Sequence, residues 1–239
     1  VDLVEHHRQI GGKFRHGCFI VLLCLSELNG ISNVRSNSRV VNYNGKTREE
    51  SLTITAILLA AGSGSRFGGD KLLHPLPDGT SIGVAAARNL LAAVPDVVAI
   101  VRPGDFPLAD LFEQEGCYVT VCPSAARGMG ASLAEGVSAR RNAAGWIVAL
   151  ADMPSIKSAT IASIVRELEA GRDLVAPVYK GQRGHPVGFG KRFGAQLMAL
   201  DGDAGARDII AVHKDDLVLI ECDDPGVLAD IDRREDLTK

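Results

Sequence analysis

The stretch Leu52-Thr-Ile-Thr-Ala-Ile-Leu-Leu59, continued by Ala-Ala-Gly-Ser-Gly-Ser-Arg-Phe-Gly-Gly-Asp-Lys71, decides the fold of this 239-residue chain. Its apolar first half, with several β-branched residues, is typical of a buried strand. The glycines that follow let the backbone approach an anion, and successive N–H groups can point into such a loop. Arg66 can form paired hydrogen bonds with phosphate oxygens, while Lys71 supplies a compact charge. The stretch therefore predicts a phosphate-binding loop directly after a strand.

Two well-known glycine loops do not match this sequence. A P-loop has Gly-x-x-x-x-Gly-Lys followed by Ser or Thr, whereas Lys71 is followed by Leu72. A Rossmann dinucleotide loop has Gly-x-Gly-x-x-Gly, and the spacing from Gly62 to Gly68 is one residue too long. A glycine-rich surface loop with two unrelated cations remains as the structural alternative.

From Leu52 onward, strand-like apolar runs alternate with amphipathic or alanine-rich helical segments. This order predicts an α/β fold of three layers, in which helices cover both faces of a mostly parallel sheet. Ligands of such sheets bind beyond the carboxyl ends of the strands, where the loop at Gly62 is expected. The predicted strands are 53–60, 97–102, 118–122, 146–151, 173–177, 186–189 and 217–221, and the predicted helices are 81–93, 108–115, 130–142, 158–170, 193–200 and 206–212.

A carboxylate follows another apolar strand in Trp146-Ile-Val-Ala-Leu-Ala-Asp152-Met-Pro154. Mg²⁺ prefers one or two carboxylates together with phosphate oxygens and water. Asp152 is therefore a candidate ligand of a magnesium ion that bridges nucleotide phosphates. The alternative is that Asp152 caps the next helix, although Ser155 or the Lys157-Ser158 step could do so instead.

Three further segments place polar groups in loops. Arg127-Gly-Met-Gly-Ala-Ser132 precedes a predicted helix whose first N–H groups can bind an anion or a polar ligand. In Arg183-Gly-His-Pro-Val187, the proline favours extended backbone at the histidine. Leu200-Asp-Gly-Asp-Ala-Gly-Ala-Arg207 ends in an arginine suited to a second phosphate. Each segment also has a structural alternative. The first is a loop that caps a helix, the second carries a surface histidine, and the third starts a helix with a solvent-exposed arginine.

In their order and spacing, these motifs resemble those of the nucleotidyltransferases that include the molybdenum cofactor cytidylyl- and guanylyltransferases. The resemblance covers about residues 54–237 and implies a Rossmann-like nucleotide-diphospho-sugar transferase fold. Ala61 favours the cytidylyltransferase-like branch, because guanylyltransferases usually have glycine at this position. The ending Asp230-Ile-Asp-Arg-Arg-Glu-Asp-Leu237 resembles the usual Asp-Ile-Asp-Thr-Pro-Glu-Asp-Leu, although Arg-Arg replaces Thr-Pro.

The resemblance implies transfer of CMP, or less favourably GMP, from an NTP to the terminal phosphate of a molybdopterin-type acceptor, with release of pyrophosphate. Mg²⁺ is the implied cofactor, held by Asp152 and also by Asp232, and CTP is the co-substrate. The implied catalytic residues are Arg66, Lys71 and Asp152, and His185 and Arg207 face the acceptor. The implied nucleotide-binding residues are Leu59, Ala60, Ala61, Gly62, Gly64, Arg66, Lys71, Gly130 and Ser132.

Alternative functions stay open at this point. In the first alternative, the fold and the reaction are the same, but the acceptor is a phosphorylated sugar or methylerythritol phosphate. A different class is an NAD(P)-dependent oxidoreductase, because some relatives of this family are described as reductases. A third is a catalytically silent binding module, such as a chaperone for a molybdoenzyme. For the transferase, a molybdoenzyme or its chaperone is a possible partner.

Composition narrows the expected partners and compartment. A net charge of −3 argues against nucleic acid as the main partner. No apolar stretch reaches the roughly 18 residues of a membrane span. The cysteines at 18, 24, 117, 122 and 222 form no C-x-x-C pair, and we expect buried, reduced thiols. The chain is therefore predicted to be cytoplasmic, with no membrane contact.

Residues 1–51 differ in composition from the remainder. They contain no alanine or proline, five of the seven asparagines, and seven Lys+Arg against five Asp+Glu. The segment 32–38 has no hydrophobic period, which is typical of a loop or disorder. We expect an extension outside a nucleotidyltransferase domain at 52–239, either disordered or an artefact of start assignment with translation beginning near residue 50. The alternative is a real helix over 19–28 that packs on the domain or on a partner.

Overall fold

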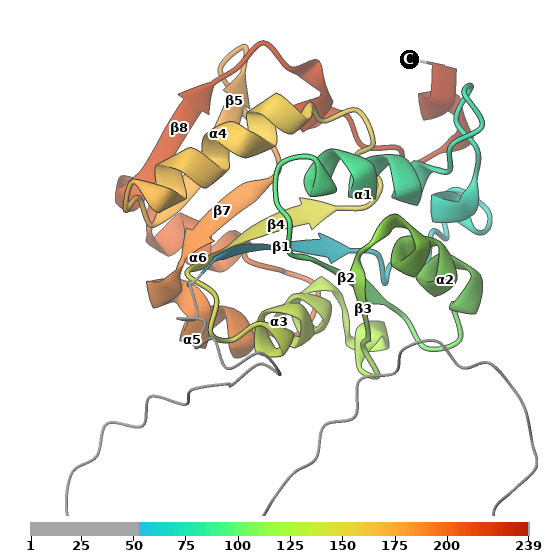
Figure 1. Cartoon of the computed structure of the whole chain (residues 1–239), viewed down its shortest axis with the longest axis horizontal. Helices are drawn as coiled ribbons and strands as arrows, with labels where there is room; N and C mark the ends of the chain where they lie inside the picture. The colour runs from blue at the N-terminus through green and yellow to red at the C-terminus, as the bar shows by residue number, and fades with distance from the viewer. Residues whose placement is uncertain (1–52, 239) are drawn as a thin grey trace, which may run out of the picture. The chain divides into compact units, whose positions relative to one another are not determined.

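The computed structural model describes residues 53–238, and the expectations for residues 1–51 lie outside this range. The described residues form an eight-stranded sheet with helices on both faces (Figure 1). This arrangement confirms the predicted three-layer α/β fold. No helix in the described part of the chain is long and apolar enough to cross a membrane.

Four parallel strands make up one side of the sheet. They are β1 (Ile54–Leu59), β2 (Val97–Val101), β3 (Tyr118–Val121) and β4 (Gly145–Leu150), in the spatial order β3-β2-β1-β4. Adjacent to both β2 and β4, β1 is buried along nearly its whole length. The loops that follow these three strands therefore lie at one edge of the sheet.

The other side of the sheet is mixed. There β7 (Val187–Gly190) runs antiparallel to both β4 and β5 (Leu174–Tyr179), whereas β8 (Leu217–Glu221) is parallel to β5. The short β6 (Gln182–Arg183), which the sequence pattern did not predict, pairs with the end of β5. Because β7 is reversed, its amino end lies at the edge where β1 and β4 end.

Alternate residues of β1 contact the two helical layers. Ala56 and Leu58 pack with α1 (Ile82–Leu91), α2 (Phe106–Glu115) and α4 (Ser158–Glu169). On the other face, Ile57 packs with helices on the opposite side (Figure 1). These helices are α3 (Met129–Ala139), α5 (Gly194–Met198) and α6 (Arg207–Val212). The 3-10 turns are η1 (Lys71–Leu73), η2 (Ala125–Arg127), η3 (Lys191–Phe193), η4 (Lys214–Asp216), η5 (Pro225–Leu228) and η6 (Arg234–Thr238).

Several predicted boundaries were wrong. The helix predicted at 130–142 begins one residue earlier, at Met129, and ends three residues earlier, at Ala139. Its close approach to the sheet depends on Gly136. A Cβ atom at Gly136 would lie 2.6 Å from the Ile57 side chain. Helix α2 begins two residues earlier than predicted, at Phe106.

The start of α4 is capped from a distant part of the chain. The buried Asp224 carboxylate accepts hydrogen bonds from Lys157 N at 2.9 Å and Thr160 Oγ1 at 2.7 Å. No side chain at the N-cap position itself makes a capping hydrogen bond. Asp152 is thus not the cap of α4, which removes the main structural alternative for this residue.

The cysteine prediction is confirmed in part. Cys117 and Cys122 are buried free thiols, whereas Cys222 is only half-buried. Burial raises the pKa of Cys117 to about 11, so this thiol stays protonated and unreactive at neutral pH. Cys18 and Cys24 lie outside the described residues.

Candidate functional site

The glycine loop follows β1 and folds back on itself before η1. Gly64, Gly68 and Gly69 have φ values of +61°, +87° and +153°, which side chains rarely adopt. A Cβ atom at Gly64 would lie 2.9 Å from Gly69 O, so the two limbs of the loop approach each other there. Glycine is therefore required for the shape of this loop.

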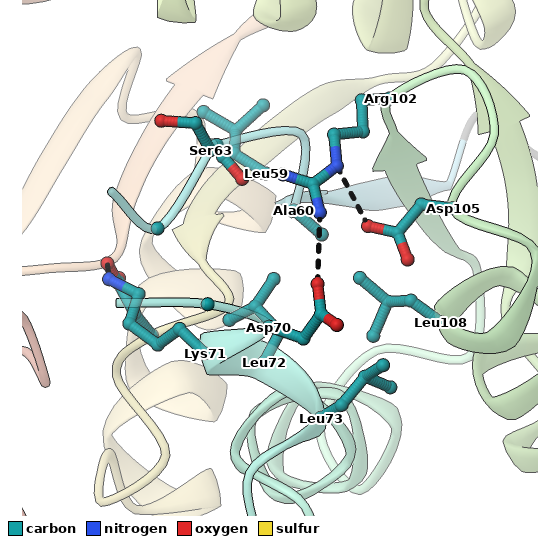
Figure 2. A pocket seen from close by; sticks show the side chains of 14 residues that line it. Leu59, Ala60, Ser63, Asp70, Lys71, Leu72, Leu73, Arg102, Asp105 and Leu108 are labelled. Atoms are coloured by element: carbon teal, nitrogen blue, oxygen red, sulfur yellow. Dashed lines mark hydrogen bonds and ion pairs between the residues drawn. The ribbon is translucent and has the colours of Figure 1, made fainter. Parts of the chain in front are cut away.

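A pocket of about 80 Å³ lies between this loop and the ends of β2 and β4; we call it the loop pocket (Figure 2). Six of the predicted site residues line it, whereas Ala61 and Arg66 do not. The six are Leu59, Ala60, Gly62, Gly64, Lys71 and Asp152. The sequence motifs after β1 and β4 therefore converge on one cavity.

Lys71 and Asp152 form an ion pair at this pocket. Lys71 Nζ lies 2.7 Å from Asp152 Oδ2, with side chains 11% and 26% exposed. The register of β1 and β4 pairs Leu59 with Leu150, which brings the segments after both strands together. The ammonium and the carboxylate are therefore both largely shielded from water and held close together at the pocket wall.

Arg66 points toward the C-terminal segment instead of lining the loop pocket. Its Nη1 lies 3.0 Å from Asp232 Oδ2, and the side chains are 72% and 38% exposed. The hydrogen bond to Asp232 raises the pKa of Arg66. Ile231 N donates to Asp152 O at 2.9 Å, so the segment that carries Asp232 also touches the Asp152 backbone.

Arg102 is a site residue that the sequence reasoning missed. Its guanidinium lies 3.3 Å from Gly62 O, 3.4 Å from Asp70 Oδ1 and 3.2 Å from Asp105 Oδ2. Figure 2 shows this side chain between the two carboxylates at the pocket wall. Arg102 directly follows β2, which pairs with β1. Its position at the carboxyl end of β2 was the sequence signal that could have identified it as a site residue.

The predicted acceptor residues His185 and Arg207 line another pocket, of about 200 Å³, which we call the second pocket. His185 precedes β7, whose reversed direction carries it to the edge where β1 ends. Burial, followed by the nearby charge of Arg183, lowers the pKa of His185. The imidazole is therefore neutral at pH 7, and its buried Nδ1 has no hydrogen-bond partner among the described residues.

Gly130 and Ser132 line neither of these two pockets. Gly130 N donates to Gly202 O at 2.7 Å, and the buried Ser132 Oγ lies 3.4 Å from Gly128 O. A nucleotide contact with Gly130 N therefore requires displacement of Gly202. Nucleotide binding by these two residues stays a prediction.

The acidic groups at the site suit a magnesium ion. In the described part of the chain, no three His, Cys, Asp or Glu residues are grouped to hold a metal by themselves. Asp152 supplies hard carboxylate oxygens at the loop pocket, whereas Asp232 does not line this pocket and pairs with Arg66. This donor set fits Mg²⁺, which keeps several water ligands and also binds phosphate oxygens.

The sequence model of the MobA-like NTP transferase domain matches residues 56–218. The chain belongs to this family. The match covers more than half of the chain and includes the glycine loop, Lys71 and Asp152. It confirms the resemblance seen in the motifs and identifies a nucleotidyltransferase-type domain.

Proteins similar to this MobA-like chain include one named as an oxidoreductase and one named as a nucleotidyl transferase. Nicotine blue oxidoreductase of Paenarthrobacter nicotinovorans is 29% identical over 194 residues, which cover 77% of this chain and 94% of that protein. A Methanothermobacter nucleotidyl transferase (Mth528) has a TM-score of 0.67 at 22% identity, covering 78% and 94% of the two chains. Rv0371c of Mycobacterium tuberculosis has a TM-score of 0.66 at 24% identity, covering 78% and 95%. Rv0371c has also been solved in complex with manganese.

We expect replacement of Arg102 by alanine to raise the KM for the nucleotide by about five- to tenfold, because a charge-assisted contact that holds the glycine loop is lost. Steady-state kinetics with varied NTP measure this effect. The matched control is Arg88→Ala, which removes an exposed Arg–Glu pair between α1 and α2, with Arg88 Nη2 2.7 Å from Glu115 Oε1. Equal KM values for the two variants would show that Arg102 does not position the loop.

Proposed function

We propose that this chain transfers CMP from CTP to the terminal phosphate of a molybdopterin-type acceptor and releases pyrophosphate. The observation that carries this proposal is the 2.7 Å contact between Lys71 and Asp152 at the loop pocket. This contact joins a cation after the glycine loop of β1 to a carboxylate after β4, which supports phosphate binding by Lys71 and metal binding by Asp152. GMP transfer from GTP is the less favoured variant, because Ala61 matches the cytidylyltransferase-like branch.

The charge of the loop pocket supports metal-dependent binding of an NTP. Two cations, Lys71 and Arg102, face three carboxylates, Asp70, Asp105 and Asp152. An anionic triphosphate alone is therefore repelled, whereas its complex with a divalent cation compensates the excess of carboxylates. Asp152 and Asp232 would hold Mg²⁺, which would supply charge neutralisation at the phosphate oxygens.

The proposed reaction does not require a strong general base. An oxygen of the acceptor phosphate attacks the α-phosphorus of CTP, and the bond from that phosphorus to the oxygen bridging to the β-phosphate breaks. Because the nucleophile is already anionic, catalysis consists of positioning and charge stabilisation. Lys71 binds the departing pyrophosphate. Arg66 contacts the triphosphate after its ion pair with Asp232 has opened. The backbone N–H groups of Gly62 and Gly64 donate to phosphate oxygens.

Nucleotide binding should depend strongly on the divalent cation. We expect CTP to bind at least tenfold more weakly in EDTA than in Mg²⁺, because the excess carboxylates of the loop pocket then repel the triphosphate. Isothermal titration calorimetry of the full chain measures both affinities. CMP, with a single phosphate, is the control and should show a smaller change. Equal CTP affinity in the two buffers would contradict the assigned role of Asp152.

The transfer itself is tested with CTP that carries a labelled α-phosphate, Mg²⁺ and purified molybdopterin. The expected result is label joined to the pterin and one pyrophosphate released per product. GTP in place of CTP should give a lower kcat/KM. Release of pyrophosphate without labelled pterin would mean that water is the acceptor in this assay and would contradict molybdopterin as the substrate. No turnover of either nucleotide would contradict the transferase proposal.

The similarity to nicotine blue oxidoreductase supports a second candidate, an NAD(P)-dependent oxidoreductase. A phosphate-binding loop also suits the pyrophosphate of a dinucleotide, so the loop alone does not separate the two functions. The carboxylate–lysine pair and the net acidity of the loop pocket favour a metal-bound triphosphate. Binding of NADPH without binding of any NTP would reverse this preference.

A further inference from the structure

The segment between α5 and α6, residues 200–206, lies across the amino end of α3, and we call it the strap. Gly130, in the first turn of this helix, donates its backbone N–H to Gly202 O at 2.7 Å. Just before the helix, Arg127 forms an ion pair with Asp201. One backbone hydrogen bond and one ion pair therefore tie the strap to α3.

Glycines allow the strap and the helix end to approach each other closely. A Cβ atom at Gly128 would lie 2.6 Å from Gly202 O, and one at Gly130 would lie 2.6 Å from Asp201 O. The two backbones therefore touch without side chains between them. Within the strap, Gly202 and Gly205 have φ values of +68° and +56°, in the region that favours glycine. Glycine lets the backbone change its dihedral angles at both positions, as hinge positions do.

The contacts that hold the strap are weak. The side chains of Arg127 and Asp201 are 64% and 51% exposed, and ion pairs this exposed stabilise a structure only slightly. Among residues 200–206, only Gly205 is buried, whereas the flanking helices bury Leu197 and Ile209. Segments with few buried apolar contacts open locally at a low cost in free energy. The strap can therefore detach while α5 and α6 stay packed in the core.

The helix end beneath the strap lies next to the cavity proposed for the nucleotide. Met129, the first residue of α3, lines the second pocket together with Leu59, and Leu59 also lines the loop pocket. The first N–H groups of a helix have no acceptor within the helix and can donate to a ligand. Gly130, one of the predicted nucleotide-binding residues, carries such an N–H, and Gly202 O occupies it. The strap and a nucleotide therefore need the same donor.

We propose that the strap is an internal competitor of the nucleotide, closed on α3 in the free protein and displaced when CTP binds. The identity of the displacing ligand rests on the proposed function. Because the closed form cannot offer Gly130 N, the apparent affinity for CTP is reduced in proportion to the fraction of open protein. Removal of a contact that closes the strap should therefore tighten nucleotide binding. Removal of a residue that contacts the nucleotide would weaken it instead.

The first test measures CTP affinity after one strap contact is removed. Asp201→Asn breaks the ion pair with Arg127, and Asp201 lines neither the loop pocket nor the second pocket. Isothermal titration calorimetry of the full chain in Mg²⁺ should show that CTP binds this variant about two- to fivefold more tightly than the wild-type chain. The matched control is Asp203→Asn, which removes an equal charge from the strap but breaks no ion pair in the described part of the chain. It should leave the affinity nearly unchanged.

A second measurement needs no nucleotide. Exchange of the Gly130 N–H with solvent, followed by NMR, reports opening of the strap, because Gly202 O protects this amide. Exchange in Asp201→Asn should be faster by about the same two- to fivefold factor, and Asp203→Asn should match the wild-type rate. Asp201 is exposed, so its variant is expected to fold, and thermal unfolding verifies this.

Two results would overturn the inference. Equal or weaker CTP binding by Asp201→Asn would show that the strap does not compete with the nucleotide. An unchanged exchange rate at Gly130 would show that the ion pair does not hold the strap closed. In both cases the transferase proposal stands as long as CTP binds. If no NTP binds either the wild-type chain or the variant, the proposed function fails, and the strap has no nucleotide to exclude.

Discussion

Lys71→Ala is expected to lower kcat/KM for nucleotidyl transfer by about 100-fold, the order of loss when one preorganised group for a developing charge is removed. Its ammonium is only 11% exposed and lies at the loop pocket, where the pyrophosphate would leave. Water that enters the vacated space cannot supply a fixed positive charge. Steady-state kinetics with saturating acceptor and varied CTP measure the effect.

A matched control separates this role from a general loss of positive charge. Lys157 Nζ donates to Asp223 O at 2.6 Å, and this residue lines neither the loop pocket nor the second pocket. Lys157→Ala should change kcat/KM less than twofold, within the range of ordinary surface substitutions. Full activity in Lys71→Ala would remove Lys71 from the mechanism.

Asp152→Asn is expected to lower kcat by about 100-fold and to raise the Mg²⁺ concentration needed for half-maximal activity. Asparagine keeps the shape of the side chain but removes the charge that pairs with Lys71 and that, in the proposed mechanism, holds the metal ion. Initial rates over a Mg²⁺ titration measure both effects. A variant with unchanged kcat and unchanged metal requirement would exclude Asp152 as a metal ligand.

Asp105→Asn is the matched control for this substitution. Asp105 lines the same pocket but pairs with Arg102 at 3.2 Å. The Asp105→Asn substitution should change the KM for CTP more than it changes the Mg²⁺ concentration needed for activity.

Lys71 and Asp152 are in direct contact, so their effects should not be independent. The double variant Lys71→Ala with Asp152→Asn should lose less activity than the product of the two single losses.

The central strand and its loop could be predicted from the sequence because local patterns determine them. The apolar run that ends at Leu59 has few alternatives to a buried strand, and the glycines before Lys71 restrict the loop to a few conformations. Asp152 could be predicted for the same reason, since it follows the strand that became β4. Parallel pairing of these two strands then brought Lys71 and Asp152 together.

The missed features depend on contacts between distant segments. Nothing near Arg102 in the sequence shows that its guanidinium reaches Gly62 and Asp70, because the pairing of β1 and β2 creates that contact. Asp224 caps α4 from the C-terminal region, and no local cap motif indicates it. Arg183 lines the pocket that contains His185 and Arg207 because it ends β6, which pairs with β5, and this pairing is not indicated by the local sequence.

The start of α3 also depends on contacts with a distant segment. Two glycines, at positions 128 and 130, lower the intrinsic preference for helix. Tertiary packing overrides this preference, because a Cβ atom at Gly130 would lie 2.6 Å from Asp201 O. The helix begins at Met129, and glycine at position 130 allows close contact with the segment around Gly202.

The most direct test of the account is a calorimetric comparison of CTP, GTP, ATP and NADPH binding to the full chain in Mg²⁺. The account predicts that CTP binds most tightly and that Lys71→Ala and Asp152→Asn each weaken its binding. Binding of NADPH alone, with none of the three nucleoside triphosphates bound, would contradict it.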